Sequence, residues 1–464
     1  MYFLLKANVQ YTFSFKILNQ VAFLILLFQN IAIFKGRKML NIISIANSIF
    51  FALIVIATIF FSYRLKYIAL GFKKFKAFPK ARTQKKFCVI IPARNESNVI
   101  GRLLKSLKEQ DYNHEKFDVY VIVESADDKT IEITQSFGYI PFIRKDLSKI
   151  GKGYAIDECV QEIFKSKKDY DILTIMDADN ILPKNFLNEF NNAYSYGFLV
   201  GNAYRRQLNA EGNWLADCST LTFSGINTFQ NKGRTIEGRN IIMSGSGLYI
   251  DFNIIKELQG WPFTTLTEDY ELSVWCTIHN IRTAYIPSTY YYDEQPTSFS
   301  QSRKQRVRWI KGFFQVRKKY GKELKKDMLN SHANLESRWD LTIGIIPNLI
   351  YIVAIILFEI FNLVTTIYLA TNHNPLYIIP LKNFVSVLII TYLILQIYTL
   401  FQLRAEKEHL NFNFKTSFKV MLLNPFYICL YIPFAIEAMT NKNVSWVPIK
   451  HGEAKTVKSI TSEK

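Results

Sequence analysis

Cysteine is scarce in this sequence, and its spacing excludes two kinds of small structural site. The five cysteines, Cys88, Cys159, Cys218, Cys276 and Cys429, are scattered over 464 residues, and no CxxC pair occurs. Zinc sites and disulfide frameworks depend on regularly spaced cysteines, so neither is indicated. Isolated cysteines of this kind fit a reducing compartment. Internal repeats and low-complexity segments are missing as well.

Charged side chains are absent from residues 39–63, a stretch of 25 residues. A run of this length is enough to span a bilayer. Three further candidate spans lie in the C-terminal third, at about 341–369, 383–403 and 420–437. The first of them contains Glu359. An ionisable group at membrane depth is a functional candidate, although an interfacial or helix-packed Glu fits equally well.

Acidic side chains are absent from residues 64–86, which hold nine Lys and Arg. Residues 303–326 hold eleven Lys and Arg against one Glu, so the two blocks account for the formal net charge of +19. A nucleic-acid binder can show such stripes, but both blocks lie beside apolar segments, which favours an anionic membrane surface. Because positive charge marks cytoplasmic loops, we expect a multi-pass protein of the cell membrane, a cytoplasmic domain between the spans and no nucleic-acid partner.

The two ends of the chain carry weaker signals. Residues 17–34 are apolar with several amides and fit a weak span, an interfacial helix or sequence upstream of a start at Met39. No small-residue cleavage site follows, so a cleavable signal peptide is not expected. The predicted organisation is a membrane segment in 1–63, an α/β domain in 84–320 with an interfacial helix at about 300–318, a membrane region in 341–437 and a polar tail in 438–464.

Short apolar runs alternate with helical patterns in the first half of the soluble region. The expected strands are 87–93, 117–125 and 170–179, and the expected helices are 97–110, 129–138 and 151–167. Strands separated by helices of this length predict a mostly parallel, Rossmann-like sheet with right-handed crossovers. In such sheets, ligands bind at the carboxyl ends of the strands.

The third expected strand ends in two aspartates, within ILTIMDADNILP (172–183). Residues two apart in an extended chain point the same way, so Asp177 and Asp179 present paired carboxylates to one ligand. Carboxylates suit Mg²⁺ or Mn²⁺, usually with substrate phosphates in the remaining positions. The same pair also fits a strand end whose carboxylates cap the following turn.

Six further motifs accompany this pair. They are PARNE (92–96), VESADD (123–128), GKG (151–153), MSGSG (243–247), TLTEDYE (265–271) and QRVRW (305–309). The glycines of MSGSG allow a substrate to approach the backbone closely. Gln305, Arg308 and Trp309 fall at i, i+3 and i+4, on one face of a helix.

Together these motifs resemble the processive family 2 glycosyltransferases, the membrane group that includes cellulose, hyaluronan and poly-N-acetylglucosamine synthases. The acidic end of the second strand, DxD, TED and QxxRW occur in that family's order, over about residues 85–315 and the flanking spans. The resemblance implies an α/β GT-A fold, a UDP-sugar donor and an inverting mechanism. One departure is Glu124, which stands where the family usually has Asp.

Each motif has a role in such a reaction. Asp179, with Asp177, would hold Mg²⁺ or Mn²⁺, and Asp269 would act as general base beside Glu268. The residues expected to bind the donor are Pro92, Arg94, Glu96, Glu124, Asp128, Lys152, Asp177 and Arg308, of which Glu124 would contact the uracil or ribose by resemblance. The residues expected to bind the acceptor are Gly245, Gly247, Gln305 and Trp309.

The chemistry supports these roles, and each has a structural alternative. The departing nucleoside diphosphate gains negative charge, which a divalent cation and fixed cations such as Arg308 stabilise. The acceptor hydroxyl must lose a proton during attack, so a base is needed. However, Glu268 and Asp269 also fit helix N-terminal carboxylates, and Trp309 also fits a membrane-interface anchor.

The predicted function is transfer of a hexose or N-acetylhexosamine from a UDP-sugar to a growing polysaccharide, coupled to export. A non-processive glycolipid glycosyltransferase carries similar motifs and is the alternative. A catalytically silent membrane scaffold and a membrane-tethered nucleic-acid binder are alternatives from other classes. The expected partners are the UDP-sugar, a polysaccharide or lipid acceptor and membrane lipids, and the sequence points to no particular protein partner.

Overall fold

A computed structural model describes residues 36–208, 212–326, 335–343, 346–441 and 443–444. The chain divides into two compact units. Within the described residues, one unit contains the chain up to Thr58 together with Leu349–Leu388, and the other contains Ile59–Asn348 together with the chain from Ile389 onward. The second unit carries the α/β domain.

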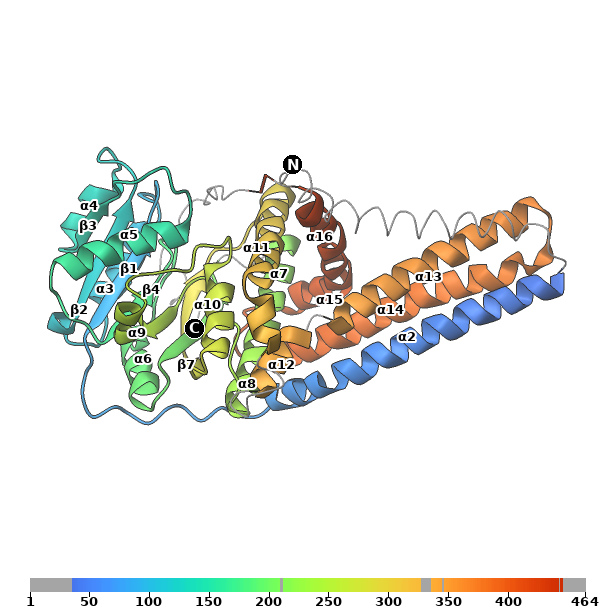
Figure 1. Ribbon diagram of the computed structural model, residues 1–464, viewed down its shortest axis with the longest axis horizontal. Helices are drawn as coiled ribbons and strands as arrows, with labels where there is room; N and C mark the ends of the chain where they lie inside the picture. Colours follow the sequence, from blue (N-terminus) through green and yellow to red (C-terminus); the bar gives the residue numbers. More distant parts are fainter. Residues whose placement is uncertain (1–35, 209–211, 327–334, 344–345, 442, 445–464) are drawn as a thin grey trace. The chain divides into compact units, whose positions relative to one another are not determined.

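A seven-stranded sheet forms the centre of the α/β domain (Figure 1). Its strands are β1 (Phe87–Pro92), β2 (Phe117–Val123), β3 (Ile140–Ile143), β4 (Ile172–Ile175), β5 (Val200–Gln207), β6 (Leu248–Asp251) and β7 (Thr283–Asp293). They lie in the order β3-β2-β1-β4-β6-β5-β7. All neighbours are parallel except β6, which runs antiparallel to β4 and β5. The predicted, mostly parallel α/β sheet is confirmed.

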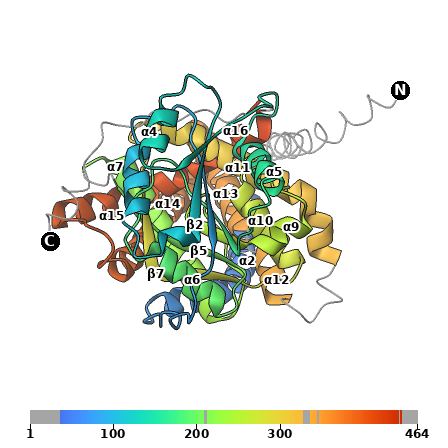
Figure 2. The same ribbon diagram turned by 90° about the vertical axis from the view of Figure 1, so that its left-hand side faces the viewer.

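Helices and short helical turns connect the strands, and two further helices follow the last strand (Figure 2). They are α3 (Ile100–Lys108), α4 (Thr130–Ser136), α5 (Lys152–Lys165), α6 (Phe186–Ser195), α7 (Trp214–Gly225), α8 (Gly233–Ile236), α9 (Phe252–Glu257), α10 (Glu268–Ile278), α11 (Phe299–Lys326) and α12 (Leu335–Ile343). A 3-10 turn, η1 (His114–Lys116), precedes β2, and a π-helix, η2 (Ile226–Lys232), joins α7 to α8. Helices of the π type are rare and occur frequently at functional sites.

The alternation of side chains in β1 builds two cores, one on each face of the sheet. Phe87, Val89 and Ile91 pack with α3 and α6, whereas Cys88 and Ile90 pack with α5 and α10. Successive residues of a strand point to opposite faces. A strand covered on both faces therefore needs a continuous apolar run, as FCVIIP provides in β1 and FDVYVIV nearly provides in β2.

The expected elements are present with shifted ends, and the second half of the domain contains elements that the patterns do not predict. The helix expected from residue 97 begins at Ile100. β3 is only four residues long and contains Pro141, so no strand pattern marks it. β5 is interrupted by polar residues such as Asn202 and Arg205, which also hides it from pattern reading.

Four helical stretches of the described residues are long and apolar enough to cross a membrane. They are Lys38–Phe60 in α2 (Gly36–Gly71), Ile350–Thr371 in α13 (Ile346–Thr371), Pro375–Ala405, which includes α14 (Ile378–Ala405), and Phe414–Thr440, which contains α15 (Phe414–Cys429) and α16 (Tyr431–Thr440). They overlap the four predicted spans and support a membrane location. Residues 17–34 and most of the predicted tail 438–464 lie outside the described residues.

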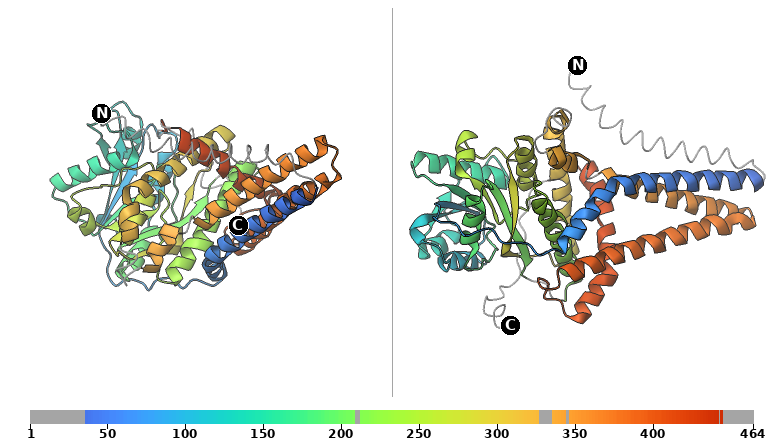
Figure 3. Two further views of the ribbon diagram at one scale, coloured as in Figure 1. Left: turned by 45° about the vertical axis from the view of Figure 1, so that its right-hand side comes forward. Right: turned by 90° about the horizontal axis from the view of Figure 1, so that it is seen from below.

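In the first unit, parts of α2, α13 and α14 lie side by side (Figure 3). Phe50 stacks on Phe358 with ring centroids 4.1 Å apart, and the Asn383 side chain donates to Asn47 at 3.2 Å. Both carboxylate oxygens of Glu359 are covered and have no hydrogen-bond partner among the described residues. Glu359 therefore remains a candidate for a functional ionisable group within the membrane.

The fourth apolar stretch is two helices rather than one. Pro425 lies inside α15, and a new helix, α16, follows it. Val420 and Tyr427 pack with residues of α7, and Phe434 packs with Val307 of α11. Both helices thus belong to the second unit, beside α11, the helix that contains the predicted interfacial segment 300–318.

Candidate active site

A cavity of about 1120 Å³ opens at the carboxyl ends of β1, β2 and β4. The predicted site residues come from separate motifs, yet all but two of them line this cavity. The exceptions are Asp128 and Gly247. The sheet explains this convergence, because parallel strands end at a common edge and their following loops meet there.

Lys152 links two of the predicted acidic motifs. Its Nζ lies 2.6 Å from Asp177 Oδ1 and 3.4 Å from Glu268 Oε1, and it also donates to the carbonyl of Gly245. Burial alone would lower the pKa of Lys152, but the carboxylates of Asp177 and Glu268 outweigh it and the pKa is raised. Lys152 is therefore a cation in the cavity at neutral pH.

The glycines of the GKG motif determine how α5 presents this lysine. Gly151 has φ of 145°, a conformation that favours glycine, directly before the helix begins. At Gly153, a Cβ atom would lie 2.1 Å from the carbonyl oxygen of Phe263. Only glycine lets the first turn of α5 pack this closely on that backbone, so the motif fixes the position of Lys152.

Glu268 and Asp269 lie in the first turn of α10. Asp269 accepts hydrogen bonds from the backbone N–H groups of Gly245 at 2.6 Å and Tyr270 at 2.8 Å, and each oxygen keeps a further lone pair. Burial raises the pKa of both carboxyls, that of Glu268 to about 7, while Lys152 acts in the opposite direction. A carboxyl whose pKa is near the working pH is suited to proton transfer.

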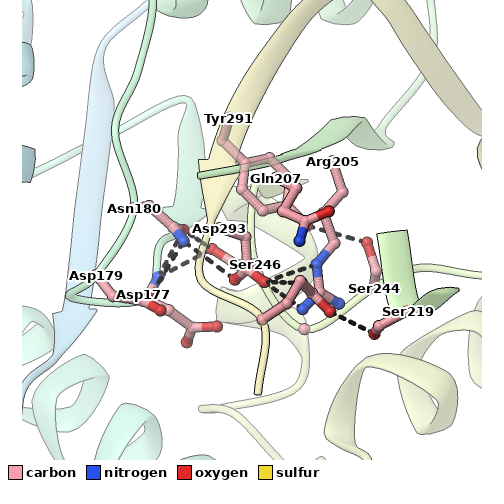
Figure 4. Close-up of polar contacts among 12 residues, drawn as sticks. Asp177, Asp179, Asn180, Arg205, Gln207, Ser219, Ser244, Ser246, Tyr291 and Asp293 are labelled. Carbon is pink, nitrogen blue, oxygen red and sulfur yellow. Dashed lines mark hydrogen bonds and ion pairs between the residues drawn. The ribbon is translucent and has the colours of Figure 1, made fainter. Parts of the chain in front are cut away.

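Asn180 holds the two aspartates of the DxD turn (Figure 4). Its Oδ1 accepts from the backbone N–H of Asp177 at 3.2 Å, and its Nδ2 donates to Asp179 Oδ1 at 3.2 Å. Ser246 bonds the same N–H of Asp177 at 2.9 Å. Asn180 is fully buried. No sequence pattern singled out Asn180, although it directly follows the DxD motif.

A second ion pair, between Arg205 of β5 and Asp293 at the end of β7, lines the same cavity. Arg205 Nε donates to Asp293 at 3.0 Å, and Asn180 donates to the other oxygen of Asp293 at 3.4 Å. The guanidinium also lies 3.8 Å from the ring centroid of Phe223. No sequence signal marks this pair, because it joins two strands that are far apart in the chain.

A close contact between α11 and the start of α10 brings Arg308 to the cavity. A Cβ atom at Gly312 would lie 2.5 Å from Thr267 Oγ1, so glycine permits this approach. Arg308 donates to the carbonyl of Leu266 at 3.0 Å, and burial lowers its pKa. Among the described residues no carboxylate forms an ion pair with Arg308. Its guanidinium is therefore available to an anionic ligand.

The other two members of the QxxRW motif also line the cavity. Trp309 packs edge-on against Phe223, with ring centroids 5.6 Å apart. Gln305 Oε1 is buried and lacks a hydrogen-bond partner in the described part of the chain. A buried acceptor without a partner is unfavourable, so a ligand hydroxyl would stabilise this amide.

Asp128 and Gly247, which were predicted to bind ligands, do not line the cavity and make contacts within the fold. Asp128 accepts from the backbone N–H groups of Asn95 and Thr130, both at 2.9 Å, and so ties the PARNE loop to α4. Gly247 has φ of 60°, and a Cβ atom there would lie 2.3 Å from the Tyr291 ring. The Asp128 carboxylate is occupied by two backbone N–H groups. Gly247 is needed for close packing on the Tyr291 ring.

Glu124 lies just after β2 between two arginines. Arg94 Nε is 2.7 Å from one of its oxygens, and Arg144 Nη1 is 3.3 Å from the other. Arg144 is almost fully buried, whereas Glu124 is partly exposed and lines the cavity with Pro92 and Glu96. The two arginines hold the carboxylate in one orientation, as recognition of a ligand by hydrogen bonds requires. Sequence patterns did not single out Arg144.

The oxygen donors of the DxD turn fit a hard divalent cation. Asp177 and Asp179 both line the cavity and supply carboxylate oxygens. Across the described ranges of the chain, no three His, Cys, Asp or Glu side chains gather into a metal site. The two carboxylates of the DxD turn suit Mg²⁺ or Mn²⁺, which take one or two carboxylates and complete their shell with phosphate and water.

Comparison with known protein families decides what this domain is. Residues 84–312 match the family model described as "Glycosyltransferase like family 2". These residues form a family 2 glycosyltransferase domain. The predicted family and enzyme class are therefore confirmed for this part of the chain, and most of the residues that line the cavity fall within it.

Two curated relatives illustrate what this family contains. The chain is 21% identical over 233 residues to the β-monoglucosyldiacylglycerol synthase of Synechocystis sp., which covers 49% of this chain and 48% of the relative. It is also 21% identical over 234 residues to the poly-β-1,6-N-acetyl-D-glucosamine synthase of Staphylococcus epidermidis, covering 49% and 54%. The chain thus spans about half the length of these relatives.

A solved structure supports the fold of the family 2 domain. The mannosyltransferase PcManGT from Pyrobaculum calidifontis, in complex with GDP-Man and Mn²⁺, superposes with a TM-score of 0.52 at 14% identity, covering 84% of this chain and 99% of that chain. Likeness at this identity concerns the fold alone. The mixed, mostly parallel sheet is of the GT-A type, as predicted from the sequence.

Proposed function

We propose that this protein is an inverting membrane glycosyltransferase, which moves a sugar from a UDP-sugar to an acceptor hydroxyl. The observation that carries the proposal is the convergence of Lys152, Arg308, Asp177, Asp179 and Asp269 on one cavity. The two cations suit a diphosphate, and the carboxylates suit a divalent cation and a general base. The family 2 domain supports the same class of reaction.

The donor would lie across the carboxyl ends of β1, β2 and β4. Glu124, fixed by Arg94 and Arg144, would accept a hydrogen bond from the base or ribose. Lys152 and Arg308 would contact the diphosphate. Asp177 and Asp179 would hold Mg²⁺ or Mn²⁺, which when bound would neutralise the charge of the leaving diphosphate.

Asp269 would take the proton of the acceptor hydroxyl. As the acceptor oxygen bonds to C1 of the sugar, the bond from C1 to the diphosphate oxygen breaks and UDP leaves, with inversion at C1. The N–H groups of Gly245 and Tyr270 hold the carboxylate in place. Gln305 and Trp309 would orient the acceptor, through the partnerless amide oxygen and the flat indole face.

For the acceptor, the sequence favours a growing polysaccharide of glucose or N-acetylglucosamine units, and a glycolipid is the alternative. The two relatives reported above are named for one product of each kind. The basic block at 64–86 follows the first span directly, so we place the catalytic domain on the cytoplasmic side of the cell membrane. The candidate spans would then provide a route for export of a polymer.

Release of UDP by membranes that contain the protein tests this proposal. The membranes are assayed with a panel of UDP-sugars and with Mg²⁺ or Mn²⁺. We expect turnover that depends on one sugar and on the cation, and the size of the product separates a polymer from a single-sugar lipid. UDP binding without release for every sugar, whatever acceptor is added, would favour the silent scaffold instead.

A further inference from the structure

Arg306, inside the QRVRW motif, is a buried cation that the proposed reaction does not use. It is 1% exposed and does not line the cavity, although its neighbours Gln305, Val307 and Arg308 do. Among the described residues no carboxylate forms an ion pair with Arg306. Burying a charged group is unfavourable unless hydrogen bonds compensate the loss of water. The contacts of this guanidinium therefore indicate what the residue does.

Two serines and an aromatic ring hold the guanidinium of Arg306 in one position. Its Nη1 donates to Ser302 Oγ in the same helix at 2.5 Å, and its Nη2 donates to Ser219 Oγ of α7 at 3.1 Å. The guanidinium carbon lies 4.7 Å from the ring centroid of Tyr427 in α15. A guanidinium is attracted to the face of an aromatic ring at this distance. Arg306 thus fastens α11 to α7 and α15.

Ser219 extends this contact to the DxD turn through Gln295. The Ser219 hydroxyl donates to Gln295 Oε1 at 2.6 Å, and Gln295 Nε2 donates to Asp293 Oδ2 at 2.8 Å. Asp293 also accepts from Asn180, the residue that holds the DxD turn (Figure 4). From Arg306 to Asp293, every hydrogen bond of this chain points the same way, from the cation toward the carboxylate.

Gln295 lies in the short connection between β7, which ends at Asp293, and α11, which begins at Phe299. It is 4% exposed and does not line the cavity. Pro296 follows it, and a residue before proline is restricted to extended conformations. An amide side chain suits this place, because it donates on one side and accepts on the other. A leucine does neither, and an ionised carboxylate only accepts.

The hydrogen-bonded chain connects two parts of the cavity wall. At one end, Asn180 orients Asp177 and Asp179, which form the proposed cation site. At the other end, the position of α11 decides where Arg308 and Trp309 lie in the cavity. A misplacement of about 1 Å between groups that act together can lower a rate by about 100-fold. The spacing between the DxD turn and α11 is therefore a property that the reaction depends on.

We propose that Gln295 is a positioning residue, which sets the spacing between the DxD turn and α11 through its two side-chain hydrogen bonds. The inference rests on the proposed glycosyltransferase function and adds to it a residue outside the cavity. Gln295 touches neither the donor nor the acceptor. On one side it acts through Asp293 and Asn180. On the other side it acts through Ser219 and Arg306.

The first test removes the hydrogen bonds in the full-length protein in membranes, assayed with Mn²⁺ and the UDP-sugar that supports UDP release by the wild type. We expect Gln295→Leu to lower kcat about 10- to 100-fold, whereas UDP titration should find as many binding sites per protein as in the wild type. Gln135→Leu, at an exposed position on α4, is the matched control and should change neither quantity. Full turnover by Gln295→Leu would overturn the positioning role while the glycosyltransferase function stands.

Ser219→Ala tests whether the effect passes along the chain. It removes one neutral hydrogen bond on each side of the serine, so we expect kcat to fall about 3- to 10-fold. The double variant Ser219→Ala/Gln295→Leu should be no slower than Gln295→Leu alone, because residues of one network are not additive. Losses that multiply in the double variant would overturn the chain.

Gln295→Glu separates hydrogen bonding from packing. A protonated Glu keeps the pattern of the amide, because its O–H donates to Asp293 and its carbonyl oxygen accepts from Ser219. An ionised Glu donates nothing and places a second negative charge beside Asp293. The other charged groups that contact the chain are Arg205 and Arg306. We therefore expect the activity of Gln295→Glu relative to the wild type to be highest at low pH and to fall as the pH rises, whereas the ratio for Gln295→Leu should stay low at every pH.

The pH series also gives results that would contradict the proposal. A ratio for Gln295→Glu that does not change with pH would overturn it, since packing alone would then explain the loss. Gln135→Glu is the matched control and should keep the wild-type activity at every pH. UDP release by the wild type together with fully active Gln295 variants would leave the proposed function standing without this inference. No UDP release by the wild type with any UDP-sugar would defeat both.

Discussion

The carboxylate of Asp269 is held by two backbone N–H groups at the wall of the cavity. We expect Asp269→Asn to retain UDP binding and to lose transfer by about 100-fold or more, because an amide does not accept the proton of the acceptor. UDP titration and UDP release on the same membranes measure the two effects. Asp127→Asn, at an exposed position after β2, is the matched control and should change neither. Full transfer by Asp269→Asn would remove this residue from the role of base.

Glu268 and Asp269 are adjacent buried carboxyls at the start of α10, so the charge of one opposes ionisation of the other. Burial raises the pKa of both, that of Glu268 to about 7. Because a base acts only when deprotonated and burial raises the pKa of Asp269, we expect kcat to fall as the pH is lowered, with an acid limb at a higher pH than an ordinary aspartate would give. Glu268→Gln removes one of two mutually repelling charges, so Asp269 ionises more easily and the acid limb should shift down by about one pH unit. If the acid limb of the pH–rate profile stays at the same pH in Glu268→Gln, the repulsion between the two carboxyls is contradicted.

Asn180 holds the DxD turn, the proposed site of the divalent cation, through hydrogen bonds to Asp177 and Asp179. We expect Asn180→Ala to raise the Mn²⁺ concentration for half-maximal activity about 10- to 100-fold, the usual effect of losing a group that orients metal ligands. A merely structural role would lower activity at every Mn²⁺ concentration without this shift. Asn185→Ala is the control, since Asn185 is exposed and its side chain caps no helix.

At the residue scale, the sequence identified groups within motifs and missed groups that meet across strands. Asp177, Lys152 and Asp269 carry signals in their own neighbourhoods, and all three line the cavity. Arg205 and Asp293 are separated by 88 residues and meet only because β5 pairs with β7. Asp128 and Gly247 do not line the cavity, and spacing alone does not distinguish a carboxylate that holds a loop from one that binds a ligand.

At the scale of elements, the contact between α11 and the start of α10 decides whether the base and Arg308 share one site. We expect Gly312→Ala to lower activity about 10- to 100-fold, because its Cβ atom would meet Thr267 at 2.5 Å and displace the helix. Gly321→Ala, on the same helix, is the matched control, since a Cβ there meets nothing within 4 Å. The control should keep activity and gain stability of at most about 1 kcal/mol. UDP-release assays and thermal unfolding of both variants measure these outcomes, and equal activity would contradict the role given to this contact.

Helices and strands could be predicted where the apolar residues kept a helical or a strand pattern without interruption. The apolar run of β4 and the helix opened by GKG were expected and are present. η2 was not expected, because a π-helix has no sequence pattern of its own and is stabilised here by contacts such as the bond from Asn231 to the carbonyl of Ile242. Asn227 and Gln230 of this π-helix line the cavity, so this part of the cavity wall is a property of packing that no motif reveals.

At the scale of the whole molecule, chain order and charge fix the expected topology. α2 leads into the catalytic domain and α13 leads out of it, so one crossing by each helix leaves both ends of the domain on the same side. The turn between α13 and α14 then lies on the opposite side. From the basic block at 64–86 we expect the domain's side to be the cytoplasmic one. UDP-sugars, which are expected there, would reach the cavity directly.

This topology predicts which positions an impermeant thiol reagent reaches in intact cells. In a Cys429→Ser background, which removes the only exposed cysteine of the described residues, Asn372→Cys in the α13–α14 turn should be labelled from outside. Lys73→Cys, an exposed position just after α2, should be labelled only after the cells are permeabilised. Each variant is the other's control for expression and reactivity. Labelling of Lys73→Cys in intact cells would place the catalytic domain outside, where the positive-inside rule does not put it and where a cytoplasmic sugar donor would not reach its site.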